Sequence, residues 1–263
     1  MSAAVEVFHV SEGAADAPSL VLLDSLGSDL SMWDPQVAPL ARRFRVIRFD
    51  LRGHGRSPVP PGPYQIADLA GDVLALLDRL EVERANLCGL SLGGMIALWL
   101  GEHAPDRVDR LVLCCTSARL EPSEAWTARA ATVRTQGMGA VADPVVGRWF
   151  TPPYAARHPE LVARMRAMIA SQPADGYASC CEAIAAMDLR SALASVRAPT
   201  LLIAGAEDAA IPPEHSERIA AAIEGARVVI VPGAAHLANV EQPERVTAAI
   251  LEHLDTADGR EGP

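Results

Sequence analysis

The sequence predicts an α/β fold in which a mostly parallel central sheet is flanked by helices and interrupted by an inserted helical segment. Three observations predict it. Short apolar runs alternate with helical patterns through the first 118 residues, and the alternation returns over residues 192–258. Between these parts, residues 119–191 show no convincing strand pattern and are punctuated by proline. Strands separated by helices favour parallel pairing, because the chain must cross back over the sheet between them.

The first part of the chain supplies four strands and two helices. The strands expected there are the apolar runs 20–23, 45–49, 85–88 and 108–115. A helix is expected over residues 66–80, where apolar residues recur every three or four positions, and a more apolar helix over residues 95–102. A proline-rich break at residues 58–63 separates the second strand from the first of these helices.

The rest of the chain divides into a cap, the remainder of the core and a tail. We interpret residues 119–191 as several short helices that form a cap inserted between two parts of one core, residues 1–118 and 192–258. Residues 259–263 are polar and are expected to form a flexible tail. The elements expected in the second part of the core are strands 200–204 and 227–231 and helices 213–222 and 243–254.

Composition excludes several classes of function. The chain has 263 residues, of which 50% are hydrophobic and 21% charged, so it is far too apolar for a disordered protein. Its net charge of −10 argues against nucleic acid or an anionic membrane as a partner. The sequence contains no lysine, so all 23 basic residues are arginine. Schiff-base chemistry on lysine and phosphate-binding loops that need lysine are therefore excluded.

Cysteine usage and the amino terminus favour a cytoplasmic protein. The five cysteines form two adjacent pairs and a singleton, which matches neither a disulfide framework nor a metal site. The first residues lack the basic and apolar regions of a signal peptide. The longest apolar run, residues 87–101, is too short and too rich in glycine to span a bilayer. We therefore expect no metal and no membrane partner, and the number of subunits stays open.

The sharpest chemical signal is the sequence GLSLG at residues 89–93, which lies between an expected strand and an expected helix. A tight strand-to-helix turn forces its central residue into strained backbone angles, and small neighbours relieve the crowding. The hydroxyl of Ser91 is then presented at the amino end of a helix, where negative charge is stabilised. Ser91 is therefore the predicted nucleophile.

A serine nucleophile needs a base, and the base needs an acid that orients it. In this topology the expected chain order is serine, acid and histidine. His236 follows the last expected strand, whereas His54, the main alternative, precedes the serine. Asp208 follows strand 200–204 and is the predicted acid, with the adjacent Glu207 as the alternative. Neighbouring residues of an extended segment point in opposite directions, so only one of the two can face the histidine.

Acyl transfer also requires donors for the oxyanion that forms on the substrate. The amide after the nucleophile, that of Leu92, is the first candidate. The second should come from the loop after the first expected strand, where the sequence is Asp24-Ser25-Leu26-Gly27. The amide of Leu26 is the predicted second donor.

Further motifs accompany the serine elbow and the loops of Asp208 and His236. They are DLRGHGRS (50–57), LDSLGSDLSMWDPQ (23–36), CGLSLGGMIALW (88–99), RWFT (148–151), GYASCCEAIAAMDLR (176–190) and AHLANVEQP (235–243). The elbow, DLRGHGRS and the two loops resemble the α/β-hydrolase superfamily. The other five segments resemble, within it, the 3-oxoadipate enol-lactonases. The matches inside the cap matter most, because this region varies between hydrolase families.

The resemblance implies a serine hydrolase of the β-ketoadipate pathway of aromatic catabolism that needs no cofactor and no metal. Its implied partner is a small anionic substrate, an enol-lactone with an acetate side chain. Arg134 and Arg148 are the predicted ligands of the carboxylate, with Arg129 also a candidate in the cap. Trp126 and Trp149 are predicted to contact the ring.

Two alternatives remain open from the sequence. The first is a carboxylesterase or a lactonase for another small ester that uses the same catalytic residues. The second is a ligand-binding receptor that keeps the hydrolase fold without turnover. An intact set of serine, acid and histidine argues against the receptor, since binding alone does not need all three.

Overall fold

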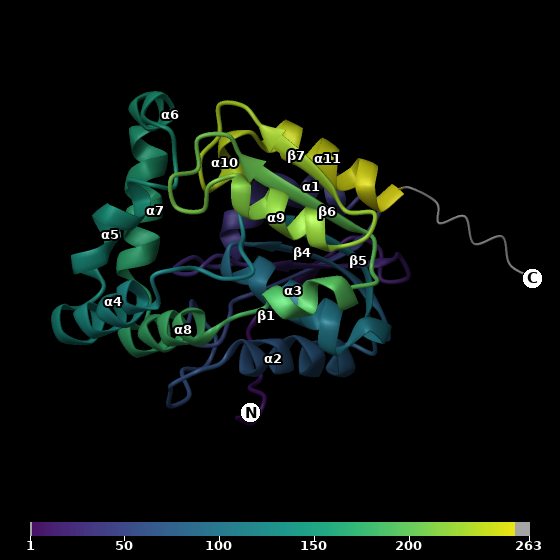
Figure 1. The fold of residues 1–263 in the computed structure, drawn as a ribbon, viewed down its shortest axis with the longest axis horizontal. Helices are drawn as coiled ribbons and strands as arrows, with labels where there is room; N and C mark the ends of the chain where they lie inside the picture. Colours follow the sequence, from purple (N-terminus) through teal and green to yellow (C-terminus); the bar gives the residue numbers. More distant parts are fainter. Residues whose placement is uncertain (1, 256–263) are drawn as a thin grey trace, which may run out of the picture.

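The computed structural model describes residues 2–255, which form one seven-stranded sheet in the order β1-β3-β2-β4-β5-β6-β7 (Figure 1). β1 runs antiparallel to β3, and every other pair of neighbours is parallel. The strands are β1 (His9–Glu12), β2 (Ser19–Leu23), β3 (Arg45–Phe49), β4 (Ala85–Leu90), β5 (Val108–Cys114), β6 (Thr200–Gly205) and β7 (Arg227–Val231). The predicted α/β class with a mostly parallel sheet is confirmed.

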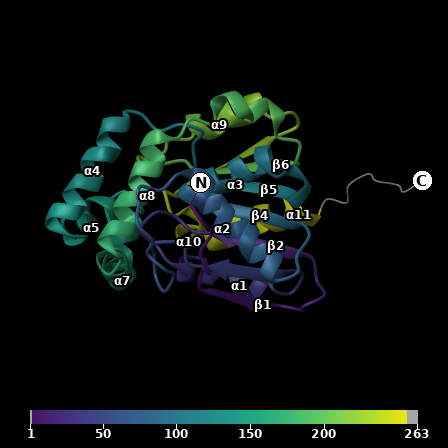
Figure 2. The ribbon, with the colours of Figure 1, turned by 90° about the horizontal axis from the view of Figure 1, so that it is seen from below.

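Helices cover both faces of the sheet (Figures 1 and 2). α2 and α3 pack together on one face, and α1 and α11 pack together on the other. The core helices are α1 (Asp34–Leu40), α2 (Ile66–Arg79), α3 (Leu92–His103), α9 (Glu214–Ala222), α10 (Ala238–Glu241) and α11 (Pro243–Asp255). Short 3₁₀ helices span Leu30–Trp33, Pro105–Arg107 and Arg190–Ser195.

The two helices on one face of the sheet follow directly from their sequences. In α2 the apolar residues lie on the buried side, and the amide of Gln65 donates to the Asp68 carboxylate at 2.9 Å to cap the first turn. α3 is apolar almost all round, because it lies against β4 and β5 beneath other elements. The sequence pattern did not predict β1, α1 or the short helix α10. β1 carries the residues HVSE, which do not alternate as a half-buried strand should.

Five helices follow one another between β5 and β6 and lie beyond the carboxyl ends of the parallel strands (Figure 1). They are α4 (Ser123–Gln136), α5 (Gly139–Val146), α6 (Pro152–Arg157), α7 (Pro159–Ala170) and α8 (Ala174–Ala186). All five fall within the predicted insertion, residues 119–191, which we continue to call the cap; its standing as a separate domain stays a prediction. The predicted tail, residues 259–263, lies outside the described residues.

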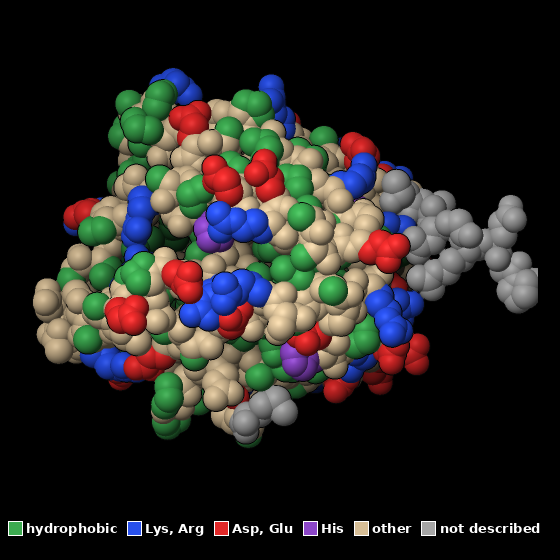
Figure 3. Space-filling model, viewed as in Figure 1, with side chains coloured by type: hydrophobic (Ala, Val, Ile, Leu, Met, Phe, Trp, Pro, Cys, Tyr) green, Lys and Arg blue, Asp and Glu red, His purple; other side chains and the backbone are tan. Residues whose placement is uncertain are grey.

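The exterior carries paired charges. Figure 3 shows acidic and basic side chains interspersed over one face of the molecule. Ion pairs such as Arg107 with Asp78, 2.7 Å apart, and Arg119 with Asp188, 2.6 Å apart, contribute to this mixture. Among the described residues, no helix combines the length and the apolar character that crossing a membrane requires.

Candidate active site

Ser91 occupies the turn between β4 and α3 with φ of 55° and ψ of −112°, a conformation that L-residues rarely adopt. Two close backbone contacts explain the flanking glycines. A Cβ atom at Gly89 would lie 2.2 Å from the carbonyl oxygen of Gly93. One at Gly93 would lie 2.3 Å from the carbonyl oxygen of Leu23. Glycine is therefore needed at both positions, because a Cβ atom there would collide with these carbonyl oxygens.

The neighbouring strand holds this turn in place. The Ser91 amide donates to the Cys114 carbonyl at 2.9 Å, and the Thr116 hydroxyl donates to the Ser91 carbonyl at 2.6 Å. The serine is 8% exposed, so its side chain sits in a pocket and not on the open surface. Strain that several contacts enforce is typical of a functional position.

The two predicted oxyanion donors come from loops that are tied to each other. Leu92 is the first residue of α3, and Leu26 follows β2 in the adjacent loop. The Gly93 amide donates to the Asp24 carbonyl at 2.9 Å and so joins the two loops. Within residues 2–255, neither the Leu26 nor the Leu92 amide makes a hydrogen bond. Both therefore remain available to an oxygen atom beside Ser91.

His236 and Asp208 form a buried pair. Nδ1 of His236 lies 2.8 Å from Oδ2 of Asp208, and the two residues are 4% and 3% exposed. The other carboxylate oxygen of Asp208 accepts from the amides of Ala210 and Ile211 at 2.8 and 2.9 Å. Because the carboxylate accepts the Nδ1 proton, Nε2 is left as the ring nitrogen that can take a proton from a hydroxyl.

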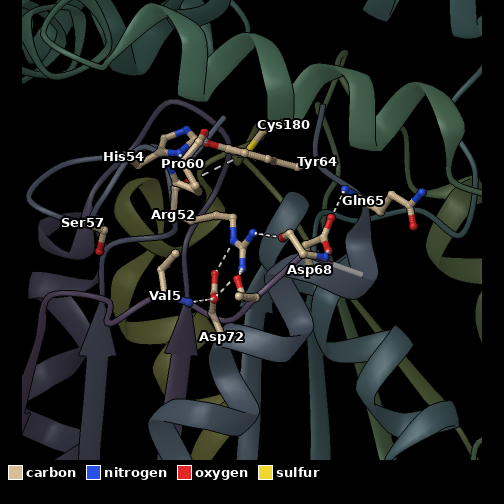
Figure 4. A network of polar contacts seen from close by, with 12 residues as sticks. Val5, Arg52, His54, Ser57, Pro60, Tyr64, Gln65, Asp68, Asp72 and Cys180 are labelled. Carbon is tan, nitrogen blue, oxygen red and sulfur yellow. Dashed lines mark hydrogen bonds and ion pairs between the residues drawn. The ribbon is translucent and has the colours of Figure 1, made fainter. Parts of the chain in front are cut away.

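The structure separates the two alternatives that the sequence left open. Glu207 is exposed, whereas its neighbour Asp208 faces His236. His54 is fully buried beside Arg52, whose guanidinium is bound to the Asp72 carboxylate at 2.5 and 2.6 Å (Figure 4). His54 accepts the Gly27 amide at 3.0 Å, so it supports the oxyanion loop and does not line the pocket of Ser91.

A small pocket of about 60 Å³ lies between the cap and the sheet and contains Ser91 and His236. Its walls come from the oxyanion loop, the cap and the loop after β6. The residues around it are Ser25, Leu26, Ser91, Leu120, Trp126, Arg129, Val145, Arg148, Trp149, Tyr177, Ala210, Ile211 and His236. The pocket therefore gathers most of the predicted site residues.

The family model described as the alpha/beta hydrolase fold matches residues 18–143 and 153–243 of this chain. The chain belongs to the α/β hydrolase family. A curated relative, 3-oxoadipate enol-lactonase 2 of Acinetobacter baylyi, is 39% identical over 94% of this chain and 92% of its own length. This hydrolase is therefore related to a 3-oxoadipate enol-lactonase, the family that its motifs resemble.

Solved structures give the same result. The enol-lactonase of Burkholderia xenovorans LB400 is 45% identical with a TM-score of 0.93, and the match covers 95% of this chain and 96% of that chain. A thermophilic esterase of Thermogutta terrifontis is 35% identical with a TM-score of 0.90, over 95% of this hydrolase and 93% of the esterase. The predicted resemblance to 3-oxoadipate enol-lactonases is confirmed.

Two arginines of the cap line the pocket of this hydrolase. The guanidinium of Arg129 lies over the ring of Trp126, 4.5 Å from its centroid. Arg148 donates from Nε to the Pro144 carbonyl at 3.2 Å. Burial and the neighbouring charge of Arg129 lower the pKa of Arg148. Neither guanidinium forms an ion pair with a carboxylate in the described part of the chain, so two positive charges face one pocket.

The prediction for Arg134 needs correction. Its guanidinium is bound to Glu182, with Nη2 2.9 Å from Oε2, and it does not line the pocket of Ser91. Arg134 follows Arg129 by five residues, which places the two on different sides of α4. Arg129 shares a side with Trp126, three residues before it, and so takes the position expected of Arg134. The other predicted contacts, Trp126, Arg148 and Trp149, do line the pocket.

Glu241 is a buried residue that the sequence analysis did not single out. Its carboxylate accepts the Ala235 amide at 2.9 Å, next to His236, and the Thr151 amide at 3.1 Å; the Thr151 hydroxyl donates to it as well. The Leu237 amide also donates to the Trp149 carbonyl at 2.9 Å. These bonds fasten the cap segment of Arg148 and Trp149 to the histidine loop. The signal in the sequence was its place in the AHLANVEQP segment, five residues after His236.

Proposed function

We propose that this hydrolase opens the ring of 3-oxoadipate enol-lactone to give 3-oxoadipate through an acyl-enzyme on Ser91, as a step of the β-ketoadipate pathway. The observation that carries the proposal is that Arg129 and Arg148 line one pocket with Ser91 and His236. Neither arginine has a carboxylate partner among residues 2–255. In a chain of net charge −10, such a pocket favours a small substrate that is itself an anion.

The first half of the reaction forms the acyl-enzyme. His236 takes the hydroxyl proton of Ser91 through Nε2, while Asp208 holds the Nδ1 proton and stabilises the charged ring. The Ser91 oxygen attacks the lactone carbonyl, and the amides of Leu26 and Leu92 receive the negative oxygen. When this intermediate collapses, the ring C–O bond breaks and His236 returns its proton to the enol oxygen. The enol then becomes the ketone.

The second half releases the product. His236 takes a proton from water, and the resulting hydroxide attacks the ester carbonyl on Ser91. The same two amides stabilise the second tetrahedral intermediate. Its collapse breaks the bond to Ser91, which regains the proton from His236. The product keeps the acetate carboxylate of the lactone and gains a second one from the hydrolysed ester.

The cap supplies the selectivity in this proposal. Arg129 and Arg148 bind the acetate carboxylate of the lactone, and Trp126 and Trp149 contact the ring. The hydrogen bonds between Glu241 and Thr151 hold this segment of the cap against the His236 loop. Recognition of the carboxylate and positioning of the carbonyl over Ser91 are therefore coupled.

The experiment compares two lactones that share a ring and differ in whether the side chain carries a carboxylate. 3-Oxoadipate enol-lactone and α-angelica lactone share the unsaturated five-membered ring, but the second has a methyl group where the first has acetate. We expect the wild type to prefer the anionic lactone by kcat/KM. The double variant Arg129→Gln/Arg148→Gln should lose about a hundredfold on the anionic lactone and little on the neutral one. Arg134→Gln is the matched control and should keep the preference.

The alternative is a carboxylesterase or a lactonase for another small ester, and the esterase of Thermogutta terrifontis at 35% identity favours it. A wild type that hydrolyses neutral esters faster than the anionic lactone would support this alternative. A third possibility is a receptor without turnover. Such a protein would bind the lactone without opening its ring. The paired Asp208 and His236 argue against the receptor, since binding does not require them.

A further inference from the structure

The pocket contains a tyrosine whose hydroxyl proton has no acceptor among residues 2–255. Tyr177, on α8, is fully buried and lines the pocket of Ser91. Within residues 2–255 its hydroxyl forms no hydrogen bond of good geometry, and the Arg129 guanidinium beside it can act only as a donor. Buried tyrosine hydroxyls usually have one, because leaving a polar group without water or a partner costs free energy. This hydroxyl therefore points to a ligand contact inside the pocket.

The charged neighbours of the hydroxyl cannot accept its proton. Arg129 and Arg148 both lie close enough to lower the pKa of Tyr177. A guanidinium carries only N–H donors, so neither arginine can accept a hydrogen bond. The thiol of Cys181, one turn further along α8, is a weak acceptor. A ligand atom with negative charge would meet three donors here, two guanidinium groups and one hydroxyl.

The tyrosine ring is held in place from the side of the oxyanion loop. A Cβ atom at Gly27 would lie 3.0 Å from Cε2 of Tyr177, so the ring rests directly on this glycine. The ring of His54 lies beyond, with 6.3 Å between the two ring centroids. α8 also packs against α4, the helix that carries Arg129 (Figure 1). The position of the hydroxyl is thus fixed relative to both the oxyanion loop and the arginines.

We propose that the hydroxyl of Tyr177 donates a hydrogen bond to the carboxylate of the substrate and, with Arg129 and Arg148, makes the subsite that selects lactones bearing a carboxylate. This inference rests on the proposed function and adds a specificity-determining residue to it. Burial raises the pKa of Tyr177, so the hydroxyl keeps its proton and remains a donor over the whole neutral range. The ring packed on Gly27 also ties carboxylate recognition to the loop that carries the Leu26 amide.

The test uses Tyr177→Phe, which removes the hydroxyl and keeps the ring that packs on Gly27. We expect kcat/KM on 3-oxoadipate enol-lactone to fall at least tenfold, mainly through KM, because the hydrogen bond forms equally in the ground and transition states. Activity on α-angelica lactone should stay within twofold of the wild type. Tyr64→Phe is the matched control, since its buried hydroxyl donates to the Pro60 carbonyl at 2.7 Å and lies outside the pocket.

A second readout does not depend on turnover. Calorimetric binding of adipate, a dicarboxylate that cannot react, should weaken about tenfold in Tyr177→Phe and stay unchanged in Tyr64→Phe. Equal losses on the charged and neutral lactones, or no loss of adipate binding, would overturn the role of Tyr177. A wild type that binds adipate through Tyr177 but leaves the enol-lactone intact would reject the proposed function alone.

Discussion

Nε2 of His54 lies 3.0 Å from the amide nitrogen of Gly27, and Nδ1 lies 3.3 Å from the carbonyl oxygen of Arg52. The first contact requires a ring nitrogen that accepts, and the second requires one that donates. The neutral ring with its proton on Nδ1 satisfies both. His54 thereby connects the loop of residues 50–57 to the oxyanion loop, and it must stay uncharged to do so.

The neutral state of His54 predicts how stability depends on pH. Burial lowers the pKa of His54 from 6.5 to about 4, so the unfolded chain takes up this proton before the folded protein does. The neutral His54 therefore contributes fully to the free energy of unfolding above pH 6.5, and this contribution is lost as the pH falls toward 4. We expect it to amount to a loss on the order of 3 kcal/mol in the free energy of unfolding.

Urea unfolding of the wild type and His54→Gln at several pH values between 4 and 7 isolates this contribution. The variant should be less stable at pH 7, because the two contacts of the ring are changed. Its stability should also fall less between pH 6.5 and 4 than that of the wild type. Parallel pH dependences in the two proteins would contradict the assignment of a neutral His54.

Because Asp208 pairs with His236, we expect substitution of Asp208, but not of its neighbour Glu207, to lower kcat strongly. Asp208→Asn keeps the size of the side chain but removes the charge that favours the Nδ1 proton, so we expect kcat to fall about a thousandfold or more. The matched control is Glu207→Gln at the exposed neighbouring position, which should leave kcat within twofold. Steady-state kinetics on the enol-lactone measure both, and a larger loss in Glu207→Gln would reverse the assignment of the acid.

The contacts of Glu241 predict an effect on stability. Glu241→Ala leaves the buried amides of Ala235 and Thr151 without their acceptor, which should reduce the free energy of unfolding by about 3 kcal/mol. Glu244→Ala, three residues along the chain and exposed, should change it by less than about 0.5 kcal/mol. Chemical unfolding at pH 7 checks both variants. If Glu241→Ala were as stable as Glu244→Ala, the cap would not depend on this carboxylate.

Periodicity and turn chemistry were enough to predict the parallel strands, the core helices α2, α3, α9 and α11, and the turn at Ser91. The apolar runs of β2 and β4 are buried on both faces, and such strands are visible without any structure. β1 was missed because it is a short edge strand whose pairing with β3 depends on distant residues and not on its own pattern.

The pocket was less predictable than the core. Arg129 and Arg134 are similar residues on one helix, and only the packing of α4 against α8 decides which of them faces Ser91. Tyr177 looks like an ordinary core residue among the alanines and cysteines of α8. Its hydroxyl is distinguished because no residue in the described part of the chain accepts its proton. This is a property of the packed cap and leaves no trace in the sequence.

If Ser91 opens the enol-lactone ring, its removal must abolish the loss of 3-oxoadipate enol-lactone, which ultraviolet absorbance follows when the lactone is made in situ. Thermal melting first establishes that Ser91→Ala is folded. We expect rapid loss of the lactone with the wild type and no loss above background with Ser91→Ala. A wild type that leaves the lactone intact would refute the proposed substrate, and a variant that still consumes it would refute the role of Ser91.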